Sequence, residues 1–404
     1  MRLVSLLGLI VMLVIAWALS ENRRKVPWRI VLWGVGLQLA FGVLVLRTRF
    51  GRVFFEYVQA AFTVVTDATK EGAGFVFGNL PQNLEIGAII AFQVLPVIIF
   101  VSSLAAILQH VRIIQVVVRA FAYIMRRSMK TSGAETFGAA LLVFLGIESL
   151  TALRGYLNQM TRSELCTIMT TFMATIAASV MVAYANFGAE PGHLLAASVM
   201  SAPAAILISK LMVPEEGTPA TDGATRVVIP VESHNVVDAA AKGASDGLHL
   251  ALNVGAMLIA FIGLIYLLDL GVKGVTGLIL AEGLTFPELM GWFFRPFAFL
   301  MGVPRGDVAA VGQLLGTKTV LNEFLAYADF KEMLAANRLS PRAAAITTYA
   351  LCGFANPGSL GILLGAATGM MPERRREIVN LGLKALIGGT LACFTTACMA
   401  GILL

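Results

Sequence analysis

The sequence has few charged residues: Asp, Glu, Lys and Arg together make up 13% of its 404 positions, about half their share in a typical soluble domain. Apolar residues make up 58%, and 39 glycines come in addition. A soluble domain of this size needs a charged surface, which so few charged side chains cannot provide. The composition therefore excludes soluble enzymes, DNA-binding proteins and disordered scaffolds. It predicts an all-α polytopic protein that is embedded in a lipid bilayer.

Cysteine and histidine are equally scarce, with four residues of each. The cysteines lie inside apolar stretches, and neither they nor the scattered histidines show the spacing of a metal site or a zinc peptidase. We therefore expect no cofactor and no enzyme. The net charge of +6 comes from basic residues in short loops between apolar runs. That is the positive-inside pattern of a membrane protein, so a nucleic-acid partner is not expected.

Apolar runs long enough to cross a bilayer predict about eight transmembrane helices in a multi-pass protein of the cell inner membrane. The basic clusters at residues 21–25 and 374–376 should be cytoplasmic, which places both termini outside. Two shorter aromatic stretches, 54–65 and 289–301, predict interfacial helices. The polar stretch 213–245 separates two halves. The predicted spans are 3–19, 30–46, 86–108 (kinked at Pro96), 165–184, 194–212, 248–268, 343–367 and 378–404.

Two apolar segments are too short to cross the bilayer. Each is interrupted by a turn, and its two arms are expected to fold back on each other. The first runs over 137–145, turns at 146–149 and continues over 150–157, and the second runs over 308–315, turns at 316–319 and continues over 320–324. Arms of about ten residues reach about 15 Å, which is half the bilayer core. Each segment is therefore expected to be a re-entrant hairpin that holds a carboxylate, Glu148 or Glu323, near the midplane.

A carboxylate at the membrane centre costs about 2.5–3.5 kcal/mol and is seldom kept without a function. The alternative is that the arms are ordinary interfacial helices whose glutamates reach toward water. For Glu148 a structural ion pair with Arg154 is a further alternative. For Glu323, the neighbouring Asn322 and the region of Asn356 provide further polar groups, which favours a substrate-binding role.

Each hairpin precedes a capped helix with polar or helix-breaking residues midway. In the second half, Asn356-Pro357-Gly358 cannot continue a regular helix, so this span should be unwound at its centre. Hairpin, broken helix and closing helix occur twice, which is typical of an inverted-repeat secondary transporter. The pattern predicts scaffold helices with an interfacial helix at 1–130, a first transport repeat at 131–212, a linker with scaffold and interfacial helices at 213–306, and a second transport repeat at 307–404.

The predicted site combines carboxylates, amides and hydroxyls with apolar walls. Carboxylates only accept hydrogen bonds, so they select solutes rich in O–H and N–H groups and disfavour anions. Phe354 could supply an apolar or stacking face. These residues indicate a neutral, hydroxylated and partly flat solute.

The runs Gly316-Thr-Lys-Thr-Val-Leu-Asn-Glu-Phe-Leu-Ala-Tyr327 and Ala350-Leu-Cys-Gly-Phe-Ala-Asn-Pro-Gly-Ser359 resemble the concentrative nucleoside transporter family in its short bacterial form. The resemblance implies a homotrimer and an elevator mechanism. It also implies that the ribose hydroxyls bind Glu323, Asn356 and Ser359, with Phe354 near the base. The first hairpin diverges, because Gly146-Ile-Glu-Ser149 stands where the family has Gly-Gln-Thr/Ser-Glu. The expected substrate-binding residues are Glu148, Ser149, Asn322, Glu323, Phe354, Asn356 and Ser359.

The coupling ion is open between Na⁺ and H⁺. The resemblance implies a sodium site at Leu145, Thr175 and Ile176, but Leu142 stands where sodium-coupled members have an asparagine. A proton carried on Glu148 is the rival interpretation. We expect a cation-coupled symporter that imports nucleosides. The alternatives are a symporter for a nucleobase, a modified nucleoside or another neutral polar solute, a non-transporting receptor, and a membrane enzyme that uses Glu148 and Glu323 as acid and base.

Overall fold

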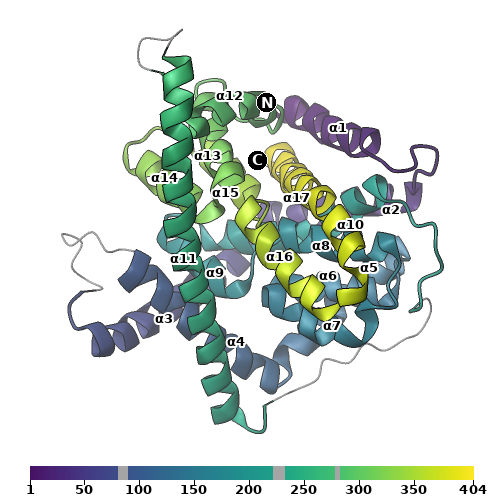
Figure 1. The fold of residues 1–404 in the computed structure, drawn as a ribbon, viewed down its shortest axis with the longest axis horizontal. Helices are drawn as coiled ribbons and strands as arrows, with labels where there is room; N and C mark the ends of the chain where they lie inside the picture. Colours follow the sequence, from purple (N-terminus) through teal and green to yellow (C-terminus); the bar gives the residue numbers. More distant parts are fainter. Residues whose placement is uncertain (81–89, 222–232, 278–282) are drawn as a thin grey trace.

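The computed structural model describes residues 1–80, 90–221, 233–277 and 283–404, and these residues form helices without any strand. Figure 1 shows the helices of the two predicted repeats packed together, with the long helix α11 (Val236–Thr276) running along one side. The two chain termini lie close together at one end of the molecule. The all-α prediction is confirmed.

The N-terminal helices are α1 (Arg2–Ala18), α2 (Trp28–Arg47), α3 (Arg49–Phe77), α4 (Leu95–His110) and α5 (Ile113–Met129). Helix α3 contains the predicted interfacial stretch 54–65 but extends it to 29 residues. A π-helical segment, Ile90–Val94, precedes α4, so Pro96 lies in the first turn of that helix. Part of the predicted span 86–108 falls outside the described residues. Helix α5 was not predicted, because its arginines interrupt the apolar run.

The first repeat comprises α6 (Gly133–Leu145), the 3-10 turn Gly146–Glu148, α7 (Ser149–Leu157), α8 (Arg162–Ala174), α9 (Ala178–Asn186) and α10 (Pro191–Met212). The second comprises α13 (Val308–Val320), α14 (Glu323–Ala335), α15 (Pro341–Leu351), α16 (Pro357–Met370) and α17 (Arg375–Leu403). Between the repeats lie α11 and α12 (Phe286–Leu300). The predicted order of hairpin, broken helix and closing helix is confirmed in both halves.

Both hairpins fold back on themselves. In the first, a Cβ placed on Gly138 of α6 would lie 2.6 Å from Leu153 Cδ1 of α7, so the two arms are in direct contact. In the second, Thr317 Oγ1 of α13 donates to Asp329 Oδ2 of α14 at 3.2 Å. Each hairpin is also tied to the helix that follows it, because Ser132 donates to Glu164 and Ser340 Oγ donates to Asp307 Oδ2.

The second hairpin turns later than expected. Helix α13 continues through Gly316 to Val320, and the turn lies at Leu321 and Asn322. One glycine costs a helix only about 1 kcal/mol relative to alanine. Asn322 is a strong N-cap, since its side chain accepts from Leu325 N at 3.0 Å and so starts α14. Gly316 instead packs against α12, where an added Cβ would meet Pro287 O at 2.7 Å. The prediction of a turn at 316–319 is therefore wrong.

Among the described residues, fewer uninterrupted helices have the length and hydropathy of a membrane-spanning helix than the eight predicted spans suggest. Among the described residues, five helical segments are long and apolar enough to cross, or six if α4 and α5, bent by 77°, form one span. Residues 133–157 pass that length test, yet they are the folded-back arms of the first hairpin. The predicted spans 165–184 and 343–367 are each divided into two shorter helices by a break.

An ion cluster joins three helices near the side that the positive-inside rule assigns to the cytoplasm. Glu21, which follows α1, accepts from Arg162 Nη2 at 2.8 Å and from Lys384 Nζ at 2.9 Å. These two cations, the hydrogen bond from Arg162 above all, lower the pKa of Glu21 to about 2. The cluster therefore connects α1, α8 and α17 while Glu21 is ionised.

Candidate functional site

The tip of the second hairpin meets the break between α15 and α16. Glu323 is the first residue of α14, and its side chain is buried, with 3% of its surface exposed. Asn356 Nδ2 donates to Glu323 Oε2 at 2.6 Å, and the Tyr184 hydroxyl donates to Glu323 Oε1 at 2.8 Å. Two donors from different helices thus hold this carboxylate in one orientation.

Asn356 uses its other side-chain atom to begin α16. Its Oδ1 accepts from Ser359 N at 2.9 Å, while Pro357 at the first helical position has no N–H to satisfy. The sequence Asn-Pro-Gly-Ser therefore breaks the helix and points the amide of Asn356 at the hairpin tip. The predicted association of Glu323 with the Asn356 region is present in the structure.

A cavity of about 80 Å³ opens beside this pair, and it is lined by Asn322, Glu323, Phe354, Asn356 and Ser359 together with Glu148 of the first hairpin. Its other walls are apolar and include Met257 and Phe261 of α11. Phe354 packs against Phe172 with ring centroids 5.5 Å apart. Six of the seven residues predicted to bind substrate therefore line one cavity, which both hairpins contribute to.

Ser149 is the exception among the predicted substrate-binding residues. Its side chain is fully buried at the start of α7, and its Oγ has no hydrogen-bond partner among the residues that the structure describes. It lines neither this cavity nor the larger one beside it. The turn at the hairpin tip directs Glu148 into the cavities and the following residue into the protein interior.

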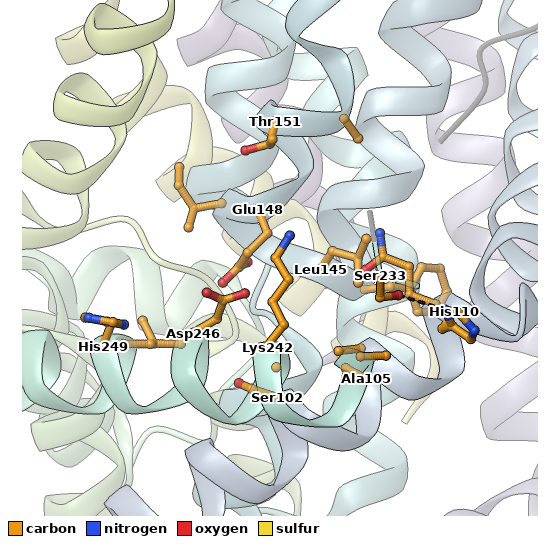
Figure 2. A pocket seen from close by; sticks show the side chains of 18 of the residues that line it. Ser102, Ala105, His110, Leu145, Glu148, Thr151, Ser233, Lys242, Asp246 and His249 are labelled. Atoms are coloured by element: carbon orange, nitrogen blue, oxygen red, sulfur yellow. Dashed lines mark hydrogen bonds between the residues drawn. The ribbon is translucent and has the colours of Figure 1, made fainter. Parts of the chain in front are cut away.

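A larger cavity, of about 510 Å³, lies between the first hairpin and helices α4 and α11. The two cavities share Ile147, Glu148, Leu250 and Ile362 as lining residues, so they meet at the tip of the first hairpin. Figure 2 shows the carboxylates of Glu148 and Asp246 pointing toward each other, with Lys242 reaching up beside them. This combined space is in the size range of small-molecule sites.

The expected partner of Glu148, Arg154, is exposed and lines neither cavity. Arg154 is six positions along the chain from Glu148, and helix α7 carries it away from the tip. The charged groups beside Glu148 come instead from α11, which the sequence places in another part of the chain. The ion-pair interpretation of Glu148 with Arg154 is therefore wrong.

The predicted sodium ligands lie around the break between α8 and α9. Thr175 is the first residue after α8, and its Oγ1 donates to Thr171 O at 2.8 Å. The tip of the first hairpin packs on this break, because a Cβ on Gly146 would lie 2.8 Å from Ala177 Cβ. Leu145, Thr175 and Ile176 are thus close in space, and their oxygens are of the hard type that sodium takes. Leu142 is buried and apolar and adds no side-chain oxygen.

Sequence comparison shows what this arrangement belongs to. Three family models match the chain: "Na+ dependent nucleoside transporter C-terminus" over residues 193–401, the corresponding N-terminus over 7–80, and "Nucleoside recognition" over 91–191. The chain belongs to the concentrative nucleoside transporter family. It is therefore a multi-pass membrane transporter and not an enzyme.

Relatives match along the whole chain. The uncharacterized transporter YutK of Bacillus subtilis is 41% identical over 402 residues, which is 98% of both chains. Mouse solute carrier family 28 member 3 is 39% identical over 417 residues, and human sodium/nucleoside cotransporter 1 is 37% identical over 425 residues. The chain spans 59% and 64% of the lengths of these two mammalian proteins.

Solved structures of the transporter CNTnw have the same fold. An inward-facing, substrate-bound form superposes with a TM-score of 0.93 at 36% identity, covering all of this chain and 98% of that one. An outward-facing form of a CNTnw variant matches with a TM-score of 0.92. The re-entrant hairpins and broken helices described above are thus the architecture of this family.

Several residues of the site were not predicted. Tyr184 reaches Glu323 from α9, and its ring stacks on Tyr327 at 4.5 Å. Asp246 and Lys242 face the first hairpin from the opposite side of the larger cavity. In the sequence, Tyr184 is a polar residue among apolar ones, and Asp246 and Lys242 are charges within a long helix. None of these features indicates which residue the side chain contacts.

Proposed function

We propose that this protein is a cation-coupled symporter that imports nucleosides across the cell inner membrane. The contact between Glu323 and Asn356 supports this most directly, since it places an acceptor-only group and an amide together beside an apolar wall. A ribose offers vicinal hydroxyls that donate to the carboxylate and accept from the amide. The sodium-dependent description of the matching family model is the second support.

In the proposed binding mode the ribose contacts Glu323, Asn356 and Ser359, and the base lies toward Phe354 and Glu148. The cavity of about 80 Å³ alone is smaller than a typical ligand site. The base would therefore extend into the adjoining larger cavity past Ile147. Because Ile147 offers no hydrogen bond, Glu148 is the group that would read the base edge.

Transport would follow from movement of the two hairpins and broken helices, residues 131–212 and 307–404, against a scaffold that includes α11. This is an elevator mechanism in a homotrimer, which we infer for this chain from its likeness to the CNTnw structures in inward-facing and outward-facing forms. The larger cavity separates the first hairpin from α11 and α4. It would provide the water-filled path on one side of the membrane.

We propose sodium as the coupling ion, bound by the carbonyls of Leu145 and Ile176 with Thr175 at the break after α8. One observation favours the proton as a second candidate. Leu142 supplies no side-chain oxygen at this break, whereas Glu148 lines the larger cavity, where its carboxylate could take up a proton.

Uptake into proteoliposomes tests these assignments. Purified protein is assayed with radiolabelled uridine, cytidine, adenosine, guanosine and inosine, and with uracil and adenine to represent nucleobases. We expect concentrative uptake of at least one nucleoside under an inward sodium gradient and none of the nucleobases. Accumulation of a nucleobase alone would favour the alternative substrate class. Binding without accumulation would indicate a receptor.

A further inference from the structure

A lysine is buried in the second transport repeat, outside the residues that line the two cavities. Lys318 lies in the last turn of α13, and only 1% of its side chain is exposed. Its Nζ donates to Ala350 O at 2.8 Å, a carbonyl in the last turn of α15. The same ammonium lies near the Cys393 thiol.

The position of Lys318 shows how the break between α15 and α16 is stabilised. The final carbonyls of a helix have no partner inside the helix and carry its negative partial charge. Lys318 supplies a donor and a positive charge at that end of α15. The chain then passes from Cys352 to Asn356, whose side chain contacts Glu323. Lys318 therefore connects the hairpin to the broken helix five residues before the substrate-site carboxylate.

The first repeat has no lysine at the matching position. Glu148 follows the N-cap of its hairpin, Ser132, by 16 positions, and Glu323 follows Asp307 by the same 16. Lys318 is 11 positions after Asp307, and the residue 11 positions after Ser132 is Val143, which is buried and uncharged. Among the described residues, the position that matches Lys318 thus brings no charge to the break after α8, whereas Lys318 brings one to the break after α15.

The break after α8 and the break after α15 pack against each other, so the two helix ends being compared are neighbours in space. Cys393 Sγ of α17 is 3.6 Å from Ala174 O and 3.5 Å from Cys352 O, so one side chain touches the carbonyl ends at both breaks. A Cβ on Gly353 would come within 3.0 Å of Ala174 C and O. One broken end has a lysine, and the other has Thr175 and Ile176, which are assigned above to the coupling ion.

We propose that Lys318 is a fixed cation that takes the place of a mobile coupling cation in the second repeat. It positions Asn356 and Glu323 without touching the substrate, and it leaves the first repeat as the place where a transported cation binds. This inference rests on the proposed nucleoside symport. Its consequence is a ratio of one coupling cation per nucleoside.

A variant set tests the positioning role. Lys318→Met removes the charge and keeps the length of the side chain, Lys318→Arg keeps the charge, and Lys331→Met on the exposed face of α14 is the matched control. We expect Lys318→Met to raise the KM for the nucleoside more than tenfold. Lys318→Arg should recover part of that loss, and Lys331→Met should leave KM unchanged. A Lys318→Met protein with the wild-type KM would overturn the proposal.

The wild-type protein provides a test that does not depend on a variant folding. The reversal potential of nucleoside flux in proteoliposomes gives the number of charges moved with each uridine or adenosine molecule. One charge per nucleoside is the expected result, and two charges would contradict the fixed-cation role while leaving nucleoside symport intact. Failure of the wild-type protein to transport any nucleoside would instead contradict the proposed function, and the inference that rests on it would fall too.

Discussion

Asn356 donates to Glu323 across 2.6 Å, and this contact joins the tip of the second hairpin to the break in the helix that follows it. Each residue also begins a helix: Glu323 opens α14, and Asn356 caps α16. The same local chemistry that ends one helix and starts the next therefore presents a carboxylate and an amide to a single cavity. A nucleoside carrier needs such an arrangement, because the groups must be fixed before the substrate arrives.

Replacement of Glu323 by Gln tests the role of this carboxylate. Gln keeps the size of the side chain, but it has one acceptor oxygen in place of two and an amide nitrogen that only donates, so it cannot accept from both Asn356 and Tyr184. A hydrogen bond to a charged group contributes about 1.5–3 kcal/mol, which corresponds to about 10- to 100-fold in affinity. We expect Glu323→Gln to abolish uptake at micromolar nucleoside while the protein still purifies as a folded species. Glu332→Gln, on an exposed part of α14, is the control and should transport normally. Unchanged uptake in Glu323→Gln would remove this residue from the site.

The response of Glu148→Gln distinguishes the two coupling ions. If protons drive transport, uptake in sodium-free buffer should respond to an imposed pH gradient, and Glu148→Gln should abolish that response. If sodium drives transport, as we propose, wild-type uptake should require sodium at constant pH, and a pH gradient alone should not support it. Uptake by the wild-type protein in sodium-free buffer would contradict sodium coupling.

Gly146 is expected to tolerate no side chain. It turns the first hairpin with φ of +63° and ψ of −138°, a conformation that costs other residues about 1–3 kcal/mol. An added Cβ would also meet Ala177 at 2.8 Å. Gly146→Ala should therefore lower the melting temperature in detergent and reduce uptake. Gly155→Ala in α7, where a Cβ has open space, should change neither. Equal behaviour of the two variants would show that the tip does not pack on the break after α8.

The ion cluster at Glu21 predicts a pH-dependent contribution to stability. Its pKa is about 2 in the folded protein, below the ordinary value of 4.5. The ionised carboxylate therefore stabilises the fold above pH 4.5, and the contribution decreases as the pH falls toward 2. Glu21→Gln should lower the melting temperature at pH 7, by an amount that corresponds to about 1 kcal/mol or less for a partly exposed cluster. The difference from wild type should shrink as the pH falls from 4.5 toward 2. Glu373→Gln, an exposed change, serves as the control, and a difference that persists at low pH would contradict the assignment.

Much of the site was readable because capping residues act locally. Asn356 and the Pro-Gly that follows it predicted the break in the last broken span, and the structure starts α16 there. Asn322 is the same kind of signal for the start of α14, but it was not used as one. The turn at Gly316 was misplaced for a related reason, since a lone glycine does not end a helix when a stronger N-cap follows six residues later.

The remaining parts depend on tertiary contacts that spacing does not encode. Tyr184 and Lys318 approach the second hairpin from other helices, and Asp246 faces Glu148 from α11. Arg154 seemed the natural partner of Glu148 because it is near in sequence, yet the direction of α7 separates them. Helix α5 was missed because its arginines lie among apolar residues on a strongly amphipathic helix that does not span by itself.

The position of the bound nucleoside tests the central claim most directly. A cryo-EM structure of the protein in lipid nanodiscs, with sodium and the nucleoside that it transports best, would show where that nucleoside lies. The account predicts ribose density against Glu323 and Asn356, with the base between Phe354 and the tip of the first hairpin. Nucleoside density at a distance from both hairpin tips, with the contact between Glu323 and Asn356 unchanged, would contradict it.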